Sequence, residues 1–462
     1  MIAHRGNVRL RVLAGALGGL LIAWVIAEAW RKTPIVRAQQ DNWTTSTAQK
    51  MGIRLVETHD AGGPAAYPVA AGDLLFFTNS GTSSGSKNVT NSVVVINART
   101  KKPIAISALN SAYTDRYTSH GIGMSTDAKY IYLPSIASIT GLEGKVPNST
   151  LVLDGRTLKL HQVIASGGPP HHVKLFRDAH GKSRVLVEDW TWSTPTMNGK
   201  GIYELDPNDD NKVVAGLLPG EAHGSMYNTF STPDGRFFYT SMPAPHVGEL
   251  RQTVGGWLAK IDMETWKLVQ SIPTKPYPLW TVFSKDGKWA WVTESGVDSV
   301  LKIQRGTGPK ESDKPVAEVK TGPGPYGLRM TIDDKEVWVA DKGEFRPQSA
   351  GTITIIDAEK NTVKDTLQTN CFSNDHIILS PDGQEMWATC NHSFEIVVLD
   401  AKTHVIKTRI PMPNLGDSHG GVFVSYKPGP AGLTAEVVSD QNGLQGSAMD
   451  AALKGAAWGS ER

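Results

Sequence analysis

The stretch 373–389, which reads SNDHIILSPDGQEMWAT, has a layout that recurs along most of the chain. A short apolar strand leads into Asp382-Gly383, and a second strand rich in aromatic and β-branched residues follows, which is the signature of a β-hairpin. Comparable stretches begin near residues 120, 223, 277 and 326. Because units of this size cannot bury their own faces, repeated copies must pack side by side. The repeat predicts an all-β chain folded as a β-propeller.

The number of blades follows from where the inner strands begin. These starts lie near residues 67, 120, 172, 223, 278, 326, 376 and 419, which favours eight blades, with seven as the alternative because only seven outer hairpins are complete. The last segment, 420–440, lacks an outer strand, and 53–58 could supply it and close the ring. We therefore expect the propeller to span 53–440 and 441–462 to form a flexible tail.

Composition excludes one large class of partners. The 462 residues carry 47 basic and 45 acidic side chains, a formal net charge of +2, and outside the amino terminus there is no basic run. A nucleic-acid-binding surface would need such a run or patch. The charges therefore indicate a solvated surface and no nucleic-acid partner.

The amino terminus carries the signals of export. Residues 12–30 form a nineteen-residue apolar run with Glu28 as its one charge, preceded by three arginines. As a helix this run would rise about 28 Å, close to the thickness of a bilayer core. We expect 1–30 to be an uncleaved signal anchor, with a cleaved signal peptide as the alternative, and 31–52 to be a tether. Either interpretation places the body in the periplasm or on another extracytoplasmic face of the membrane.

The chain has two cysteines, Cys371 and Cys390, which fall on the two arms of one predicted hairpin. In an oxidising compartment they could form a local disulfide, and a pair of buried thiols is the alternative. No Cys-x-x-Cys-His motif is present, which excludes covalent c-type haem.

Histidines recur at the entry to the inner strands. His120, His172, His223 and His376 are separated by 52, 51 and 153 residues, and the last spacing is three times 51. His419 holds the equivalent place 43 residues later, and His171 adjoins His172. Equivalent slots converge on one end of the channel, so these six residues are the predicted metal ligands: His120, His171, His172, His223, His376 and His419. Single histidines at such slots also serve as ordinary hydrogen-bonding residues, which is the competing interpretation.

Carboxylates stand beside several of these histidines. Asp375 adjoins His376 and Glu221 precedes His223 by two residues. Such groups can fix the tautomer of a ligating imidazole, and we also expect Glu221 and Asp375 to be candidate proton carriers. Two slots without histidine are aromatic, 277–280 and 325–327, and these side chains would either cover a planar cofactor or pack the channel.

The order of strands and turns in each repeat resembles that of the YVTN-type propellers, a group that includes the d-type haem domain of the dihaem nitrite reductases. The resemblance covers about 53–440 and implies the fold, but it names no substrate. It also implies an alternative cofactor, a d-type haem with His120 or His376 as axial ligand. Lys174, Arg116 or Arg329 would then bind the haem carboxylates.

The doublet His171-His172 and the later single histidines are similar to those of the copper propellers of nitrous oxide reductase and thiocyanate dehydrogenase. The chain departs from the first because no cupredoxin domain follows Asp440. The resemblance implies copper, which imidazole ligands also suit. We expect a membrane-tethered oxidoreductase acting on a small substrate with an electron-transfer partner. The alternative is a haem-d carrier or a non-catalytic scaffold of a membrane complex.

Overall fold

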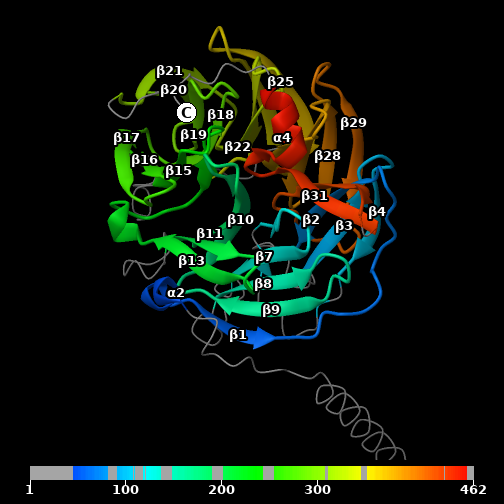
Figure 1. Cartoon of the computed structure of the whole chain (residues 1–462). Helices are drawn as coiled ribbons and strands as arrows, with labels where there is room; N and C mark the ends of the chain where they lie inside the picture. Colours follow the sequence, from blue (N-terminus) through cyan, green and yellow to red (C-terminus); the bar gives the residue numbers. More distant parts are fainter. Residues whose placement is uncertain are drawn as a thin grey trace, which may run out of the picture.

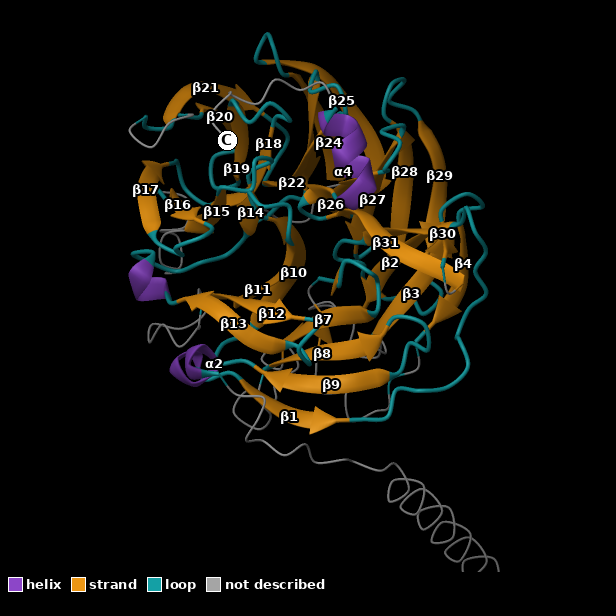
Figure 2. Ribbon diagram, viewed as in Figure 1, coloured by secondary structure: helices purple, strands orange, loops and turns teal. Residues whose placement is uncertain are grey.

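The computed structural model of the chain describes residues 45–81, 91–107, 109, 118–119, 121–136, 148–189, 201–242, 254–306, 311–344, 351–430 and 432–454. These residues form seven antiparallel sheets that stand around a central axis (Figures 1 and 2). The predicted all-β propeller is confirmed in this architecture.

The first three sheets come from the amino-terminal half. The first contains β1 (Arg54–Thr58), β9 (Leu160–Ala165), β8 (Ser149–Asp154), β7 (Tyr130–Ile136), β5 (Thr118–Ser119) and β6 (Gly123–Met124). The second contains β10 (Pro170–Arg177), β11 (Ser183–Asp189), β12 (Ile202–Asp206) and β13 (Lys212–Leu217). The third contains β14 (Thr229–Ser231), β15 (Phe237–Met242), β16 (Trp257–Asp262) and β17 (Leu268–Pro273).

The next three sheets repeat the same order. The fourth contains β18 (Pro278–Phe283), β19 (Trp289–Glu294), β20 (Ser299–Gln304) and β21 (Lys314–Lys320). The fifth contains β22 (Pro325–Met330), β23 (Glu336–Asp341), β24 (Gly351–Asp357) and β25 (Thr362–Cys371). The sixth contains β26 (Ser373–Leu379), β27 (Glu385–Asn391), β28 (Glu395–Asp400) and β29 (Ile406–Pro411).

The seventh sheet joins both ends of the described chain. Its order is β32 (Gly443–Leu444), β31 (Gly432–Asp440), β30 (Val422–Gly429), β2 (Leu74–Ser80), β3 (Ser92–Asn97) and β4 (Lys102–Ile106). Three short helices complete the described elements, namely α2 (Ser46–Met51), the 3₁₀ helix η3 (Pro219–Glu221) and α4 (Gly446–Leu453).

This closure corrects the expectation of eight blades for the described residues. The starts near 67 and 419 were counted separately, but they lead into the same sheet, in which Phe76 of β2 lies opposite Phe423 of β30. The strand at 53–58 also has another partner than expected, because β1 pairs with β9 of the first sheet. Strands from both ends of the described chain close the ring, and the described residues form seven sheets.

Side chains fix the turn after the inner strand in five of the seven sheets. In five sheets a hydroxyl donates to an aspartate two residues later, and that aspartate accepts the backbone N–H two residues further on. The pairs are Ser125–Asp127, Thr232–Asp234, Ser284–Asp286, Thr331–Asp333 and Ser380–Asp382. At Gly383 the backbone has a φ of 73°, a left-handed conformation that glycine adopts at no steric cost. The hairpin turns predicted from the sequence are present.

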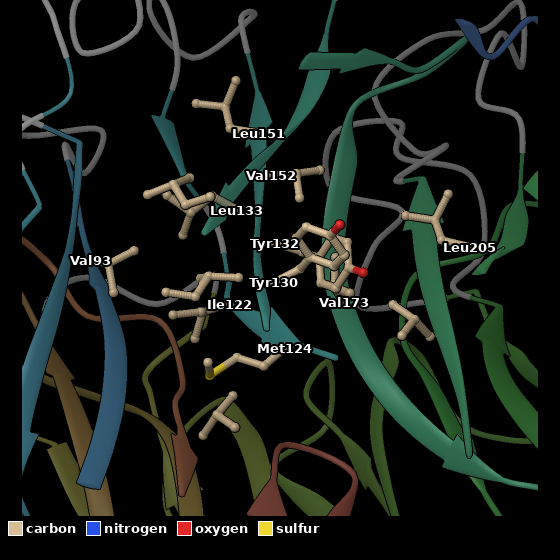
Figure 3. Packing of buried hydrophobic residues seen from close by; sticks show 14 of the residues in the cluster. Val93, Ile122, Met124, Tyr130, Tyr132, Leu133, Leu151, Val152, Val173 and Leu205 are labelled. Atoms are coloured by element: carbon tan, nitrogen blue, oxygen red, sulfur yellow. The ribbon is translucent and has the colours of Figure 1, made fainter. Parts of the chain in front are cut away.

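The hydrophobic core lies between neighbouring sheets. In Figure 3, Met124 of the first sheet and Val173 of the second sheet lie near Tyr132, and Val93 of the seventh sheet and Ile122 belong to the same cluster. Tyr132 is fully buried, and its hydroxyl donates to Asn211 over 2.7 Å. Aromatic and β-branched residues of the inner and second strands therefore fill the spaces between blades.

The carboxy-terminal segment closes one end of the channel. We call the end where inner strands begin the entry end, and the other the exit end. At the exit end, four hydrogen bonds tie residues 439–442 to inner strands of four sheets. They join Leu175 N to Asp440, Asn442 to Ser231, Arg329 to the Gln441 carbonyl and Ser439 to the Leu379 carbonyl. Residues 441–454, expected within a flexible tail, instead form this closure with β32 and α4.

The predicted anchor and most of the tether, 1–44, lie outside the described residues, as does 455–462. Among the residues that the structure describes, no helix is long and apolar enough to cross a membrane. Cys371 and Cys390 form a disulfide between the end of β25 and β27, so it joins the fifth sheet to the sixth.

Replacement of Trp387 tests the packing at the ring closure. Trp387 is fully buried, and its ring lies 4.7 Å from Phe76 and 5.2 Å from Phe423 of the seventh sheet, measured between centroids. Trp387→Ala should lower the free energy of unfolding by about 3–5 kcal/mol because a cavity opens between sheets. Val405→Ala, at a position 59% exposed, should change it by less than about 0.5 kcal/mol. Urea unfolding followed by circular dichroism measures both, and equal midpoints would contradict this packing role.

Candidate metal site

The entry end of the channel brings four of the predicted histidines together. His171 and His172 begin β10, His376 lies in β26, and His419 precedes β30. The first three side chains are fully buried, and His419 is 5% exposed. Neighbouring inner strands approach closely here, since a Cβ at Gly327 would stand 2.4 Å from the Asp375 carbonyl oxygen. Only glycine therefore fits at this point of β22.

Two imidazoles face each other at the centre of the cluster. The Nε2 atoms of His172 and His376 are 3.2 Å apart. Two nitrogens bound to one tetrahedral metal ion at about 2.0–2.1 Å would lie roughly 3.3 Å apart. The observed separation therefore fits a shared metal ion, and it also fits a proton shared between the rings.

A carboxylate stands behind each of these imidazoles. Asp375 Oδ2 lies 2.6 Å from His376 Nδ1, and Glu188 Oε2 lies 3.8 Å from His172 Nδ1. A carboxylate on the Nδ1 side favours the tautomer that leaves the Nε2 lone pair for a cation. With both rings in that tautomer, two lone pairs would face each other over 3.2 Å, which requires a positive charge between them.

The flanking histidines extend the donor set. His419 Nδ1 lies 3.0 Å from Asp375 Oδ2, so one carboxylate contacts two imidazoles. On the other side, the rings of His171 and His172 are 3.8 Å apart. Two groups of potential ligand atoms result, each within 4.8 Å: His171 with His172 and Glu188, and Asp375 with His376 and His419.

Buried lysines balance the two carboxylates. Lys342 Nζ lies 3.0 Å from both Asp375 Oδ1 and Glu344 Oε2. Lys174 Nζ lies 2.6 Å from Glu188 Oε1 and also donates to the Thr229 carbonyl over 3.0 Å. Each carboxylate thus binds an ammonium on one side and faces imidazole on the other, an arrangement that keeps the buried charges paired.

These surroundings shift the protonation equilibria. Burial raises the pKa of Asp375, but its contacts with His376 and Lys342 outweigh burial and hold that pKa well below its usual value. Burial raises the pKa of Glu188 to about 7, against the opposing charge of Lys174. Burial lowers the pKa of His376 in spite of Asp375, and together with Lys174 it lowers the pKa of His171. Neutral imidazole, the form that binds metals, is therefore favoured at both positions.

Aromatic rings surround the facing imidazoles. Trp280 lies 4.8 Å from His376 and 6.0 Å from His172 between ring centroids, and Tyr326 lies 5.5 Å from His376. The hydroxyls of Tyr326 and Tyr227 are 2.7 Å apart, and the ring of Tyr227 lies 4.5 Å from that of His171. The aromatic slots of the sequence are thus channel packing that excludes water from the cluster.

The structure does not bring Glu221 and His223 to this cluster. Glu221 ends η3 on the surface and forms an ion pair with Lys50 over 2.9 Å. His223 is exposed, with a φ of 64°, and the inner strand β14 begins only at Thr229. His120 and Arg116 lie outside the described residues. Of the predicted residues, His171, His172, His376, His419 and Asp375 are the ones that meet.

Sequence reasoning missed the carboxylate and ammonium groups that second strands supply. Glu188 lies in β11 directly opposite His172 in the strand register, and Lys342 follows β23. The position of Glu188 could be predicted from the sequence, because pairing the two strands of the second hairpin places it opposite His172. Lys342 comes from the neighbouring fifth sheet. Its contact with Asp375 could not be predicted without knowing how the sheets pack around the ring.

A mutant cycle tests the buried Asp375–Lys342 pair. Lys342→Met should lower the free energy of unfolding by about 3 kcal/mol because it leaves the Asp375 charge without its ammonium. In an Asp375→Asn background the same change should cost at least about 1 kcal/mol less, since that charge is already gone. Lys335→Met, at a lysine whose side chain is 80% exposed beside Asp333, is the control and should cost less than about 0.5 kcal/mol. Additive single and double effects in urea unfolding would contradict the pairing.

Comparison with known proteins adds structural relatives. No protein-family model and no curated protein matches the chain. Among solved structures, the periplasmic gluconolactonase of Pseudomonas aeruginosa has a TM-score of 0.55 at 14% identity, over 76% of this chain and 99% of that one. Hydrazine synthase of Kuenenia stuttgartiensis has a TM-score of 0.52 at 16% identity, over 67% and 90%. A Lactobacillus plantarum protein has a TM-score of 0.52 at 13% identity, over 75% and 98%.

At such identities the likeness concerns the fold alone. With the seven sheets around one axis, it identifies the chain as a β-propeller.

Proposed function

We propose that the protein is an exported β-propeller that binds a redox metal ion, with copper favoured, and acts on a small substrate in a redox reaction. The observation that carries this proposal is the 3.2 Å separation of the buried Nε2 atoms of His172 and His376. His172 and His376 would hold the ion, and His171 and His419 would complete its ligands.

The donor set supports copper over metals that prefer thiolates. The chain has two cysteines, and both are consumed by the disulfide. The remaining donors at the site are imidazoles backed by carboxylates, a set that suits copper, non-haem iron or zinc. A bound copper ion would supply one-electron chemistry, because it cycles between two oxidation states.

The residues around the histidines have supporting roles. Asp375 orients His376 and His419, and Glu188 faces His172. The low pKa of Asp375 makes it an orienting anion, and it is poorly suited to the proton-carrier role first considered. Trp280 and Tyr326 exclude water from the imidazoles. Because the carboxy-terminal segment closes the exit end, substrate would approach from the entry end.

Export is supported by the disulfide, since such bonds persist in oxidising compartments. One structural relative is a periplasmic gluconolactonase by description. The apolar run at 12–30 provides the route of export, and we retain the membrane tether and the electron-transfer or membrane-complex partner as parts of the proposal.

The haem-d alternative finds less support. Lys174, one expected partner of the haem carboxylates, is fully buried and already bound to Glu188, Asn228 and Thr229. Arg329, another expected partner, lies at the exit end beside Gln441. No specific contact among the described residues favours the haem-d alternative or the scaffold role. The experiment below distinguishes both from the proposed metal site.

The experiment is metal analysis of the purified exported body, residues 39–462, reconstituted with copper or iron. We expect at least one copper ion per chain and an electron paramagnetic resonance spectrum with nitrogen hyperfine structure from imidazole. His172→Ala/His376→Ala should reduce the metal content to background, because it removes the two converging nitrogens.

The matched control is His161→Ala/His180→Ala, which also removes two histidines but leaves the site intact and should keep the metal. A haem-type visible spectrum would establish the alternative cofactor. A folded, colourless and metal-free protein would refute the redox proposal and leave the scaffold role.

A further inference from the structure

A cavity lies at the exit end of the channel, and none of the four clustered histidines lines it. It has a volume of about 110 Å³ and lies where the inner strands β10, β14, β18, β22 and β26 end. The carboxy-terminal residues Asn442–Gln445 and the helix α4 form its other side. Figures 1 and 2 show α4 in front of the fifth and sixth sheets, which contain β22 and β26.

One buried cation lines this cavity. Arg329 is 5% exposed, and no ion pair joins its guanidinium to any carboxylate in the described part of the chain. Its Nη2 donates to the Gln441 carbonyl over 2.6 Å and its Nε to the Ile377 carbonyl over 3.4 Å. No acceptor within the described ranges binds Nη1, which lies 3.0 Å from where a Cβ at Gly443 would stand. Gly443 itself lines the cavity, so this N–H group faces it.

The other charged groups at the cavity already have partners. Arg177 forms an ion pair with Asp450 of α4. Lys285 donates through its ammonium to the Ile332 carbonyl over 2.9 Å, and its backbone N–H donates to Asp334 over 2.9 Å. Burial lowers the pKa of Arg329 to about 10, partly offset by Asp440, so the guanidinium stays charged at neutral pH. A buried charge without a close counterion favours an anion beside it.

Much of the remaining wall is apolar and includes Val282, Phe283, Met330, Leu379, Leu444 and Leu453. Polar residues of the wall are Ser231, Thr331, Asn442 and Gln445. On α4, Met449 and Leu453 are four residues apart and share the helix face that covers the cavity, yet both are only half-buried. The helix therefore leaves apolar surface facing space that the protein does not fill.

We propose that this cavity binds a small monocarboxylate with a short alkyl chain. The carboxylate would accept hydrogen bonds from Arg329 Nη1, and the chain would lie against Phe283, Met330 and Leu453. A cavity of 110 Å³ offers roughly eight positions for water-sized groups, which matches a six-carbon acid. Arg329 is the one buried cation among the described residues that line the cavity, and one buried positive charge suits one negative charge better than a phosphate dianion.

The test is titration of the purified full-length protein with sodium hexanoate, measured by isothermal titration calorimetry. We expect saturable binding with one site per chain, and at least tenfold weaker binding of hexan-1-ol and hexylamine. Arg329→Gln should weaken hexanoate at least tenfold, because the amide keeps a donor but loses the charge. Leu453→Glu places a negative charge on the exposed side of the cavity and should weaken it similarly without altering an inner strand.

Two controls assign the binding to this cavity. Arg99→Gln, at an exposed arginine of the seventh sheet, should leave the affinity unchanged. His172→Ala/His376→Ala should also leave it unchanged, which excludes hexanoate acting as a ligand of a metal ion. Equal affinity for hexanoate and hexylamine, unchanged affinity in Arg329→Gln or Leu453→Glu, or no binding in the millimolar range would overturn the proposal.

Discussion

The hydrogen bonds between β2 and β30 close the ring, and the other features of the molecule depend on that closure. A four-stranded sheet with apolar residues on both faces is stable only between two neighbours, so an open row of sheets would leave two faces in water. The chain avoids this by pairing a strand near its beginning with a strand near its end. Once the ring is closed, the starts of the inner strands must converge, and residues far apart in sequence meet on the axis.

That convergence has an electrostatic cost, and the site is built to offset it. Asp375 and Glu188 are both buried, as are Lys174 and almost all of Lys342. Each carboxylate has one ammonium within 3.0 Å and at least one imidazole on its other side. Packing alone would favour apolar residues at these positions, since replacing buried ion pairs with apolar side chains is often neutral or stabilising. Charged groups retained at such cost, with the pKa values of two imidazoles lowered, are typical of a functional site.

The sequence predicted the repeating parts of this structure better than the unique ones. The turns could be predicted because Ser380 and Asp382 stand in a local pattern that recurs in four other sheets. His172 and His376 could be matched because a shared slot on an inner strand needs only a count along the chain. The prediction for His223 was wrong because its inner strand is short and begins six residues later. His223 therefore lies in an exposed turn.

The blade count and the charged partners required information that no local pattern holds. Counting starts cannot show that two of them lead into one sheet, because that depends on which strands pair across the whole chain. Lys342 reaches Asp375 from the neighbouring sheet, and Arg329 meets Gln441 only because the carboxy-terminal segment crosses the exit end. These contacts are set by the packing of sheets around the axis.

The length of one inner strand separates the chemistry of the two ends. β10 begins beside His172 and ends at Arg177, and five residues of strand at about 3.3 Å each span roughly 17 Å. Gln441 stands between the ends, since its carbonyl accepts from Arg329 and its amide donates to the His419 carbonyl over 3.2 Å. Hydrogen bonds through Gln441 therefore connect the histidine cluster to the cavity that Arg329 lines.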